Sequence, residues 1–121
     1  MRLLKVLGLF LCALALCSIA TAGVNKMGIH DVSHVTFSSV VHVGTAVLPA
    51  GEYIVRHTME GQDHVMVFQN IQGKDVAKVK CTLVPLAKKA DKNEELYQLN
   101  AGNERVLQEL VFRGDTSKHV F

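Results

Sequence analysis

The stretch EYIVRHTMEGQDHVMVFQNI, residues 52–71, decides the fold class of this protein. Apolar and polar side chains alternate within residues 52–59 and again within residues 64–71, with EGQD between them. Alternation with a period of two places every second side chain on one face of a β-sheet, and a short Gly-containing link joins two antiparallel strands. We therefore predict a β-hairpin whose turn is centred on Gly61-Gln62.

The same alternation continues on both sides of this hairpin, with turn signals at the spacing of a sandwich or barrel. Further strands are predicted at residues 34–43 (one long strand, or two short ones broken near Ser38-Ser39), 75–86, 94–99, 105–112 and 119–121. Residues 44–51 are predicted to be a connection. Residues 104–112 also have helical apolar spacing, but the β-rich context favours a strand. The prediction is one all-β domain, an antiparallel β-sandwich or small open barrel of about seven strands.

The first 22 residues have the pattern of an export signal. Arg2 and Lys5 form a positive n-region, VLGLFLCALA at residues 6–15 is a short apolar segment, and Ala20-Thr21-Ala22 is a small-residue cleavage site. The apolar run covers roughly 15 residues, whereas a membrane span needs about 20, so we expect cleavage after Ala22 and no stable membrane span. The predicted organisation is a signal peptide, residues 1–22, and an all-β domain, residues 23–121, that is secreted or periplasmic.

Length and charge narrow the classes of function. The chain has 121 residues, enough for one domain, with 13 Lys and Arg against 11 Asp and Glu. Removal of residues 1–22 leaves 11 basic and 11 acidic side chains, and the one local cluster of like charge is Lys88, Lys89 and Lys92. A neutral domain of this kind argues against nucleic-acid binding and against a polybasic membrane patch.

Cleavage also removes Cys12 and Cys17, so Cys81 has no partner for an internal disulfide. Alternation within VKCTL, residues 79–83, places Cys81 on the apolar face of its strand. Free cysteine is among the most buried residue types. We therefore expect Cys81 to be a small core side chain rather than a reactive thiol.

The connection before the hairpin carries a motif. Val43-Gly44 followed by LPAGEYIVR, residues 48–56, resembles small secreted bacterial proteins, common in soil groups such as acidobacteria, with a VG…LPAGxYxV core. Those proteins are mostly β-sandwich or β-barrel proteins of unknown function, so the resemblance implies a secreted domain and no catalytic residue. In physical terms, Pro49 sets φ for a turn, Gly51 supplies a conformation that other residues resist, and Tyr53 starts the next strand with a half-buried ring. The structural motif comprises Leu48, Pro49, Ala50, Gly51 and Tyr53.

The strongest candidate site is HTM, residues 57–59, together with HVM, residues 64–66. In the predicted hairpin Met59 lies opposite His64 and His57 lies opposite Met66, so all four side chains share one face. Two imidazoles and two thioethers suit a soft ion such as Cu(I). The alternative is core packing, because the apolar side chains of Val55 and Phe68 continue this face. A register shift of one residue would scatter the four donors.

The other motifs give weaker support for a functional site. The remaining histidines are expected in turns or on the surface: His30, His34, His42 and His119. Arg113-Gly114-Asp115 is the tripeptide of integrin ligands, but Gly-Asp is also ordinary turn sequence. The sequence has no HExxH, CxxC, G-x-S-x-G or phosphate-binding glycine motif, so we expect no enzymatic activity and no cofactor other than copper.

Three readings of function remain open. The first is a secreted, non-enzymatic β-sandwich with a binding or structural role toward an unidentified protein or envelope partner. The second is a periplasmic copper-binding protein that uses the His/Met hairpin. The third is an assembly or adhesion subunit that pairs through an edge strand, with the tail at residues 118–121 as the candidate edge, which would make the protein an oligomer.

Overall fold

Nine β-strands make up the regular secondary structure of residues 25–121, the part of the chain that the computed structural model describes. The strands are β1 (Val32–Phe37), β2 (Val41–Val43), β3 (Ala46–Leu48), β4 (Gly51–Glu60), β5 (Asp63–Gln69), β6 (Asp75–Pro85), β7 (Glu94–Leu99), β8 (Arg105–Val111) and β9 (Ser117–Val120). No helix able to cross a membrane is found in residues 25–121. The all-β prediction is confirmed, and the predicted signal peptide, residues 1–22, lies outside the described residues.

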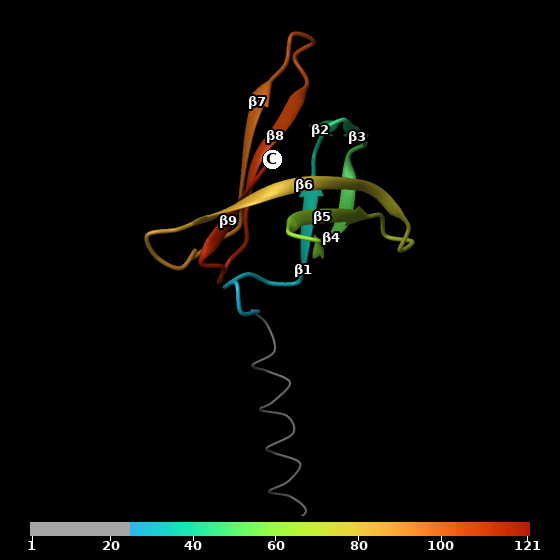
Figure 1. Cartoon of the computed structure of the whole chain (residues 1–121). Coiled ribbons are helices and arrows are strands. Elements are labelled where there is room, and N and C mark those ends of the chain that lie inside the picture. The colour runs from blue at the N-terminus through green and yellow to red at the C-terminus, as the bar shows by residue number, and fades with distance from the viewer. Residues whose placement is uncertain (1–24) are drawn as a thin grey trace, which may run out of the picture.

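The strands follow one path, β1-β4-β5-β6-β9-β8-β2-β3, and β7 pairs with β8. The long strand β6 joins two halves, because residues 75–81 pair with β5 and residues 82–85 pair with β9. Figure 1 shows β6 curving across the molecule between the β4–β5 hairpin and the β7–β8 hairpin. The path does not return to β1. The architecture is therefore an open, sandwich-like sheet rather than a closed barrel.

The β4–β5 hairpin has the predicted register. Glu60 pairs with Asp63 around Gly61-Gln62, and the pairing continues to Ile54 opposite Gln69. His57 consequently lies opposite Met66, and Met59 lies opposite His64.

Three features differ from the prediction. The connection 44–51 contains the strand β3, because Gly44, at a φ of 59°, permits a tight turn that pairs β3 with β2. β2 also runs parallel to β8, whereas we predict only antiparallel pairs. The tail strand β9 lies between β6 and β8, so it is not the edge strand required by the third reading. Among the described strands, the free edges belong to β1, β3 and β7.

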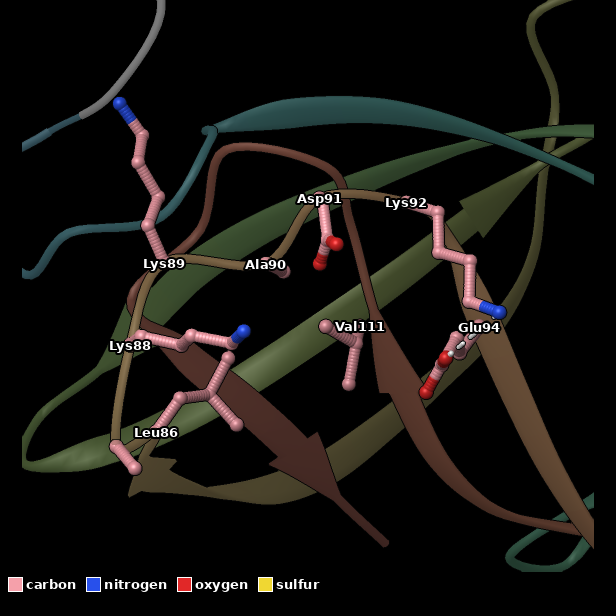
Figure 2. A pocket seen from close by; sticks show the side chains of 9 residues that line it. Leu86, Lys88, Lys89, Ala90, Asp91, Lys92, Glu94 and Val111 are labelled. Carbon is pink, nitrogen blue, oxygen red and sulfur yellow. Dashed lines mark ion pairs between the residues drawn. The ribbon is translucent and has the colours of Figure 1, made fainter.

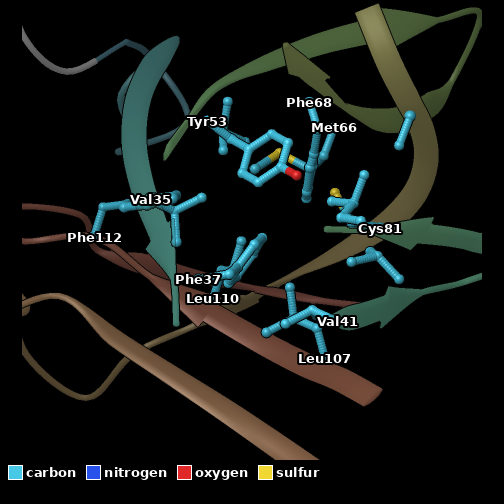
Figure 3. Close-up of a cluster of buried hydrophobic side chains, with 14 residues drawn as sticks. Val35, Phe37, Val41, Tyr53, Met66, Phe68, Cys81, Leu107, Leu110 and Phe112 are labelled. Atoms are coloured by element: carbon cyan, nitrogen blue, oxygen red, sulfur yellow. The ribbon is translucent and has the colours of Figure 1, made fainter. Parts of the chain in front are cut away.

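One hydrophobic core holds the two halves together (Figure 3). The ring of Phe37 lies 5.6 Å from Tyr53 and 6.5 Å from Phe68, measured between centroids. Phe68 is fully buried and also contacts Phe121 edge to face at 6.2 Å. Leu107 and Leu110 of β8 pack against this group from the other half. Both halves therefore depend on the same apolar contacts.

The LPAGEY segment connects β3 to β4. Leu48 is buried at the end of β3, and Gly51 opens β4 with a φ of 149°, a conformation that L side chains rarely adopt. Tyr53 is only 6% exposed, so its ring is more buried than the half-buried position that we predict. Its hydroxyl donates a hydrogen bond of 2.5 Å to the carbonyl oxygen of Pro49, which ties the turn to the strand that follows it.

Replacing Tyr53 with phenylalanine tests this tie. The ring stays in the core, but the bond to Pro49 is lost, so we expect the free energy of unfolding to fall by about 0.5–1.5 kcal/mol. Urea unfolding followed by circular dichroism measures the change. An unaltered midpoint would show that the hydroxyl contributes nothing to the turn.

Candidate functional site

The imidazole rings of His57 and His64 meet near the turn of the β4–β5 hairpin. Nε2 of His57 lies 3.0 Å from Nδ1 of His64, and the ring centroids are 5.1 Å apart. At this distance one neutral ring donates a hydrogen bond to the other. His57 is 7% exposed, whereas His64 is half-buried. The two imidazoles of the predicted site are therefore in direct contact, with one side open to solvent.

The two methionines of the predicted site lie on either side of this pair. Met66, opposite His57, is 1% exposed and belongs to the hydrophobic core. Met59, opposite His64, is 45% exposed at the end of β4. Residues opposite each other in an antiparallel pair have Cβ atoms about 4.5–5.5 Å apart, so each thioether is a neighbour of one imidazole. The hairpin thus combines a buried and an exposed sulfur with the His57–His64 pair.

His119 is a third imidazole beside this pair, and its predicted place in a turn or on the surface is wrong. It lies on the interior strand β9 and is fully buried. Its ring centroid lies 5.9 Å from that of His57 and 5.8 Å from that of Phe112. Within the described chain, neither ring nitrogen of His119 has a hydrogen-bond partner. The alternation of Ser117, His119 and Phe121 was the only sequence signal for an inward-facing ring, and the strand is too short for that signal to be decisive.

Asp115 connects His119 to the start of the described chain. Its Oδ1 accepts hydrogen bonds from the main-chain N–H of His30, at 3.1 Å, and from Nδ1 of the same residue, at 2.6 Å. Its Oδ2 lies 3.8 Å from Nε2 of His119, too far for a hydrogen bond. Asp115 is fully buried. The carboxylate of Arg113-Gly114-Asp115 is therefore not presented to a receptor, and this tripeptide does not support the adhesion reading.

The last two histidines lie away from this site, where the sequence predicts them. His34 is exposed on β1. His42 is half-buried on β2 and lies 3.1 Å from the carboxylate of Glu104.

The surroundings of His57 favour its neutral form. Burial lowers the pKa of His57, and the nearby rings of His119 and His64 lower it further, whereas the carboxylate of Asp31 opposes this effect. A neutral imidazole is the form that binds a metal ion, because protonation occupies the lone pair that a metal needs. The surroundings of His57 therefore favour the protonation state that a metal ligand needs.

Cys81 lies on β6, where it pairs with His64 of the neighbouring strand β5. It is 9% exposed and belongs to the hydrophobic core, which confirms the prediction of a small core side chain. Burial raises the pKa of its thiol to about 11. Cys81 is thus a protonated sulfur close to the histidine pair.

Because its thiol is buried and protonated, we expect Cys81 to be alkylated slowly in the folded protein. With a pKa of about 11, roughly one thiol in a thousand is ionised at pH 8, and the thiolate is the reacting species. We expect the rate of reaction with iodoacetamide to rise about tenfold per pH unit between pH 8 and pH 10, and to rise sharply at pH 8 in urea. Fast labelling of the folded protein at pH 8 would contradict the buried position.

A cavity of about 240 Å³ under the β6–β7 loop is a separate candidate (Figure 2). Lys92 lies 3.5 Å from the carboxylate of Glu94, and Figure 2 shows the side chain of Lys89 directed away from the cavity. Neither Lys88 nor Lys89 has an ion-pair partner among the described residues, so Lys88 is the one lysine without such a partner that stays at the cavity, beside the apolar side chain of Leu86. A single exposed lysine does not form an anion site, so the histidine cluster remains the better candidate.

As they stand, no three or more histidine, cysteine, aspartate or glutamate side chains of residues 25–121 form a group that could hold a metal ion. His57 and His64 supply a pair of nitrogens, and any further donor must come from a neighbouring sulfur or from a ring that turns. The sequence matches no protein-family model, and no curated protein or solved structure matches it significantly.

Proposed function

We propose that this protein is an exported, non-enzymatic β-sandwich module that binds a soft metal ion, Cu(I), through His57 and His64, with Met59 and Met66 as the neighbouring thioethers. The observation that carries the proposal is the distance of 3.0 Å between Nε2 of His57 and Nδ1 of His64. At the Zn–N bond length of about 2.0–2.1 Å, taken here as a guide for a metal bound by imidazole, two nitrogens on one ion lie about 2.9–3.4 Å apart for bond angles between 90° and 109°. An ion could therefore replace the shared proton without a change in the separation of the two nitrogens, although both rings would have to turn toward it.

The donor set favours copper over harder ions. Thioethers select Cu(I), whereas carboxylates and carbonyl oxygens suit Mg²⁺ and Ca²⁺. Both methionines lie on the face of the sheet that carries the two rings. Among the described residues, no carboxylate forms a hydrogen bond with the ring of His57 or His64. The export signal predicted in residues 1–22 supports a role in holding copper outside the cytoplasm.

Native mass spectrometry of the protein purified without chelators from an exporting cell tests this function. The expected mass lacks residues 1–22 and carries an increment of one copper, which Cu(I) titration restores after chelation. Zn²⁺ at the same concentration is the comparison ion. A protein that stays bare at saturating Cu(I) would overturn the proposal and leave the first reading, a module for a protein or envelope partner.

Assembly through an edge strand is a second candidate function, and one observation favours it. β7 pairs only with β8 among the described strands, and Leu96 and Leu99 on it are 54% and 58% exposed. Glu94 and Glu95 protect the start of this edge by charge, but the exposed apolar side chains of Leu96 and Leu99 leave the rest of it open to another strand.

Sedimentation velocity measures this second function. If β7 pairs with β7 of a second copy, Leu96→Lys should convert the oligomer into a monomer without changing the circular dichroism. Val47→Lys, on the exposed edge strand β3, is the matched control. A wild-type protein that is monomeric at every concentration contradicts this function.

A further inference from the structure

Strand β1 has a free edge whose main-chain groups are directed away from β4, its one partner among the described strands. The main-chain N–H of His57 donates a hydrogen bond of 2.9 Å to the carbonyl oxygen of Asp31, which makes these two residues a hydrogen-bonded pair. Hydrogen-bonded and non-hydrogen-bonded pairs alternate along an antiparallel ladder. The register therefore directs the main-chain N–H and C=O groups of His34 and Thr36 outward, where no strand of residues 25–121 pairs with them.

Two cavities flank this part of the edge, and residues 34–36 line both of them. The core-side cavity, of about 210 Å³, is also lined by Leu110 and Phe112, which are labelled in Figure 3. The outer cavity, of about 370 Å³, is also lined by Ile54 and Ile71. A peptide that adds a strand to a sheet edge gains affinity from main-chain hydrogen bonds and specificity from cavities that receive its alternate side chains. The edge of β1 offers both features.

Each cavity is lined by a carboxylate without an ion-pair partner among the described residues. Glu95 lines the core-side cavity and Glu52 lines the outer cavity, and neither forms an ion pair within residues 25–121. Glu94, which also lines the core-side cavity, lies 3.5 Å from Lys92. No lysine or arginine lines either cavity. The charge beside the edge is therefore negative and favours a basic partner.

We propose that the free edge of β1 binds an extended basic segment of another protein by strand addition. This inference goes beyond copper binding and does not rest on it. The main chain of the segment pairs with residues 34–36, and its consecutive side chains enter the two cavities alternately. A lysine or arginine fits the core-side cavity, because its apolar stem packs beside Leu110 while its charge meets Glu95. A β-branched side chain fits the outer cavity beside Ile71.

A second copy of this chain does not supply such a segment from its free edges. The described strands with a free edge are β1, β3 and β7, and none of them contains a lysine or an arginine. β7 begins with Glu94 and Glu95, which would meet the carboxylates beside β1 with like charge. Like charges brought together suppress the wrong partner. The charge of the site thus selects a different protein.

Titration of the ¹⁵N-labelled protein with the blocked synthetic peptide TVKVT, followed by NMR, tests the inference. The amide signals of His34 and Thr36 are expected to shift, because their N–H groups gain partners. The peptide TVEVT, which differs only in the charge of its central residue, should bind at least about tenfold more weakly. A TVKVT peptide with every main-chain nitrogen methylated keeps its side chains but cannot donate hydrogen bonds, so it should not bind.

Charge reversal at Glu95 tests the partner of the basic side chain. In Glu95→Lys, TVKVT should bind at least about tenfold more weakly than in wild type, and the preference should change to TVEVT. Glu104→Lys is the matched control, since Glu104 lies beside His42 and lines neither cavity. This variant should keep the preference of wild type.

Three results would overturn the inference: no shift of the β1 amides at about 1 mM TVKVT, shifts confined to β7, or equal affinity for TVKVT and TVEVT. An unchanged preference in a folded Glu95→Lys variant would also overturn it. If that variant does not fold, as judged by circular dichroism, Glu95→Gln and the two peptides on wild type decide the matter. Copper binding is measured separately, so its failure leaves this inference intact.

Discussion

Replacing His57 and His64 together with alanine is expected to abolish Cu(I) binding while the sandwich stays folded. The two rings supply the pair of nitrogens 3.0 Å apart on which the proposed site is built. Their loss should cost more affinity than the about 10- to 100-fold that follows from altering an outer-shell partner. The free energy of unfolding should fall by more than the about 0.5–1.5 kcal/mol of one buried hydrogen bond, because truncation of the buried His57 ring also leaves a cavity. Chelator competition and urea unfolding measure the two quantities on the same samples.

The matched control removes the same number of imidazoles elsewhere. His34 is exposed on β1, and His42 lies on β2 beside Glu104, both outside the cluster. The variant His34→Ala/His42→Ala should keep the Cu(I) affinity of wild type. Copper binding that persists in the His57→Ala/His64→Ala protein and disappears in the control would place the ion outside the hairpin.

Phe68→Ala is expected to be the most destabilising single change in the core. Phe68 is fully buried on β5 and contacts Phe37 and Phe121, so its removal opens a cavity between the two halves. Truncation of a buried phenylalanine costs about 3–5 kcal/mol. Small domains are stable by only about 5–15 kcal/mol, so the variant should unfold at much lower urea concentration.

Ile71→Ala serves as the control for this change. Ile71 is 71% exposed, in the turn after β5. Its truncation should alter the free energy of unfolding by no more than about 0.5 kcal/mol, the usual range for surface substitutions. Similar urea midpoints for Phe68→Ala and Ile71→Ala would mean that β5 does not form the centre of the core.

Part of the candidate site could be predicted from the sequence. The pairing of His57 with Met66 and of Met59 with His64 could be predicted, because a short turn and a two-residue period together set the register of a hairpin. The position of His119 beside His57 could not be predicted, since His119 lies on a four-residue strand far away in the sequence. The sequence predicts Asp115 in a turn, and only its burial and its bonds to His30 show that this turn carries a polar contact.

Short strands account for the errors in the fold. β2 and β3 contain three residues each, too few for alternation to be recognised, so the sequence predicts a connection where β3 forms. The parallel pairing of β2 with β8 depends on strands far apart in sequence, and neither strand carries a local signal of its neighbour.

The sequence by itself determined the all-β class, the longer strands, the β4–β5 register and the face shared by His57, Met59, His64 and Met66. These properties are local, because alternation and turn chemistry act over a few residues. Only the tertiary structure decided that β9 is an interior strand, that β7 has a free edge, and that His119 lies beside His57, with Asp115 next to His119. The physical reason is that strand order and the packing of the two halves arise from contacts between distant segments. The pattern within one strand specifies which face of that strand is buried, but not which other strands pack against this face.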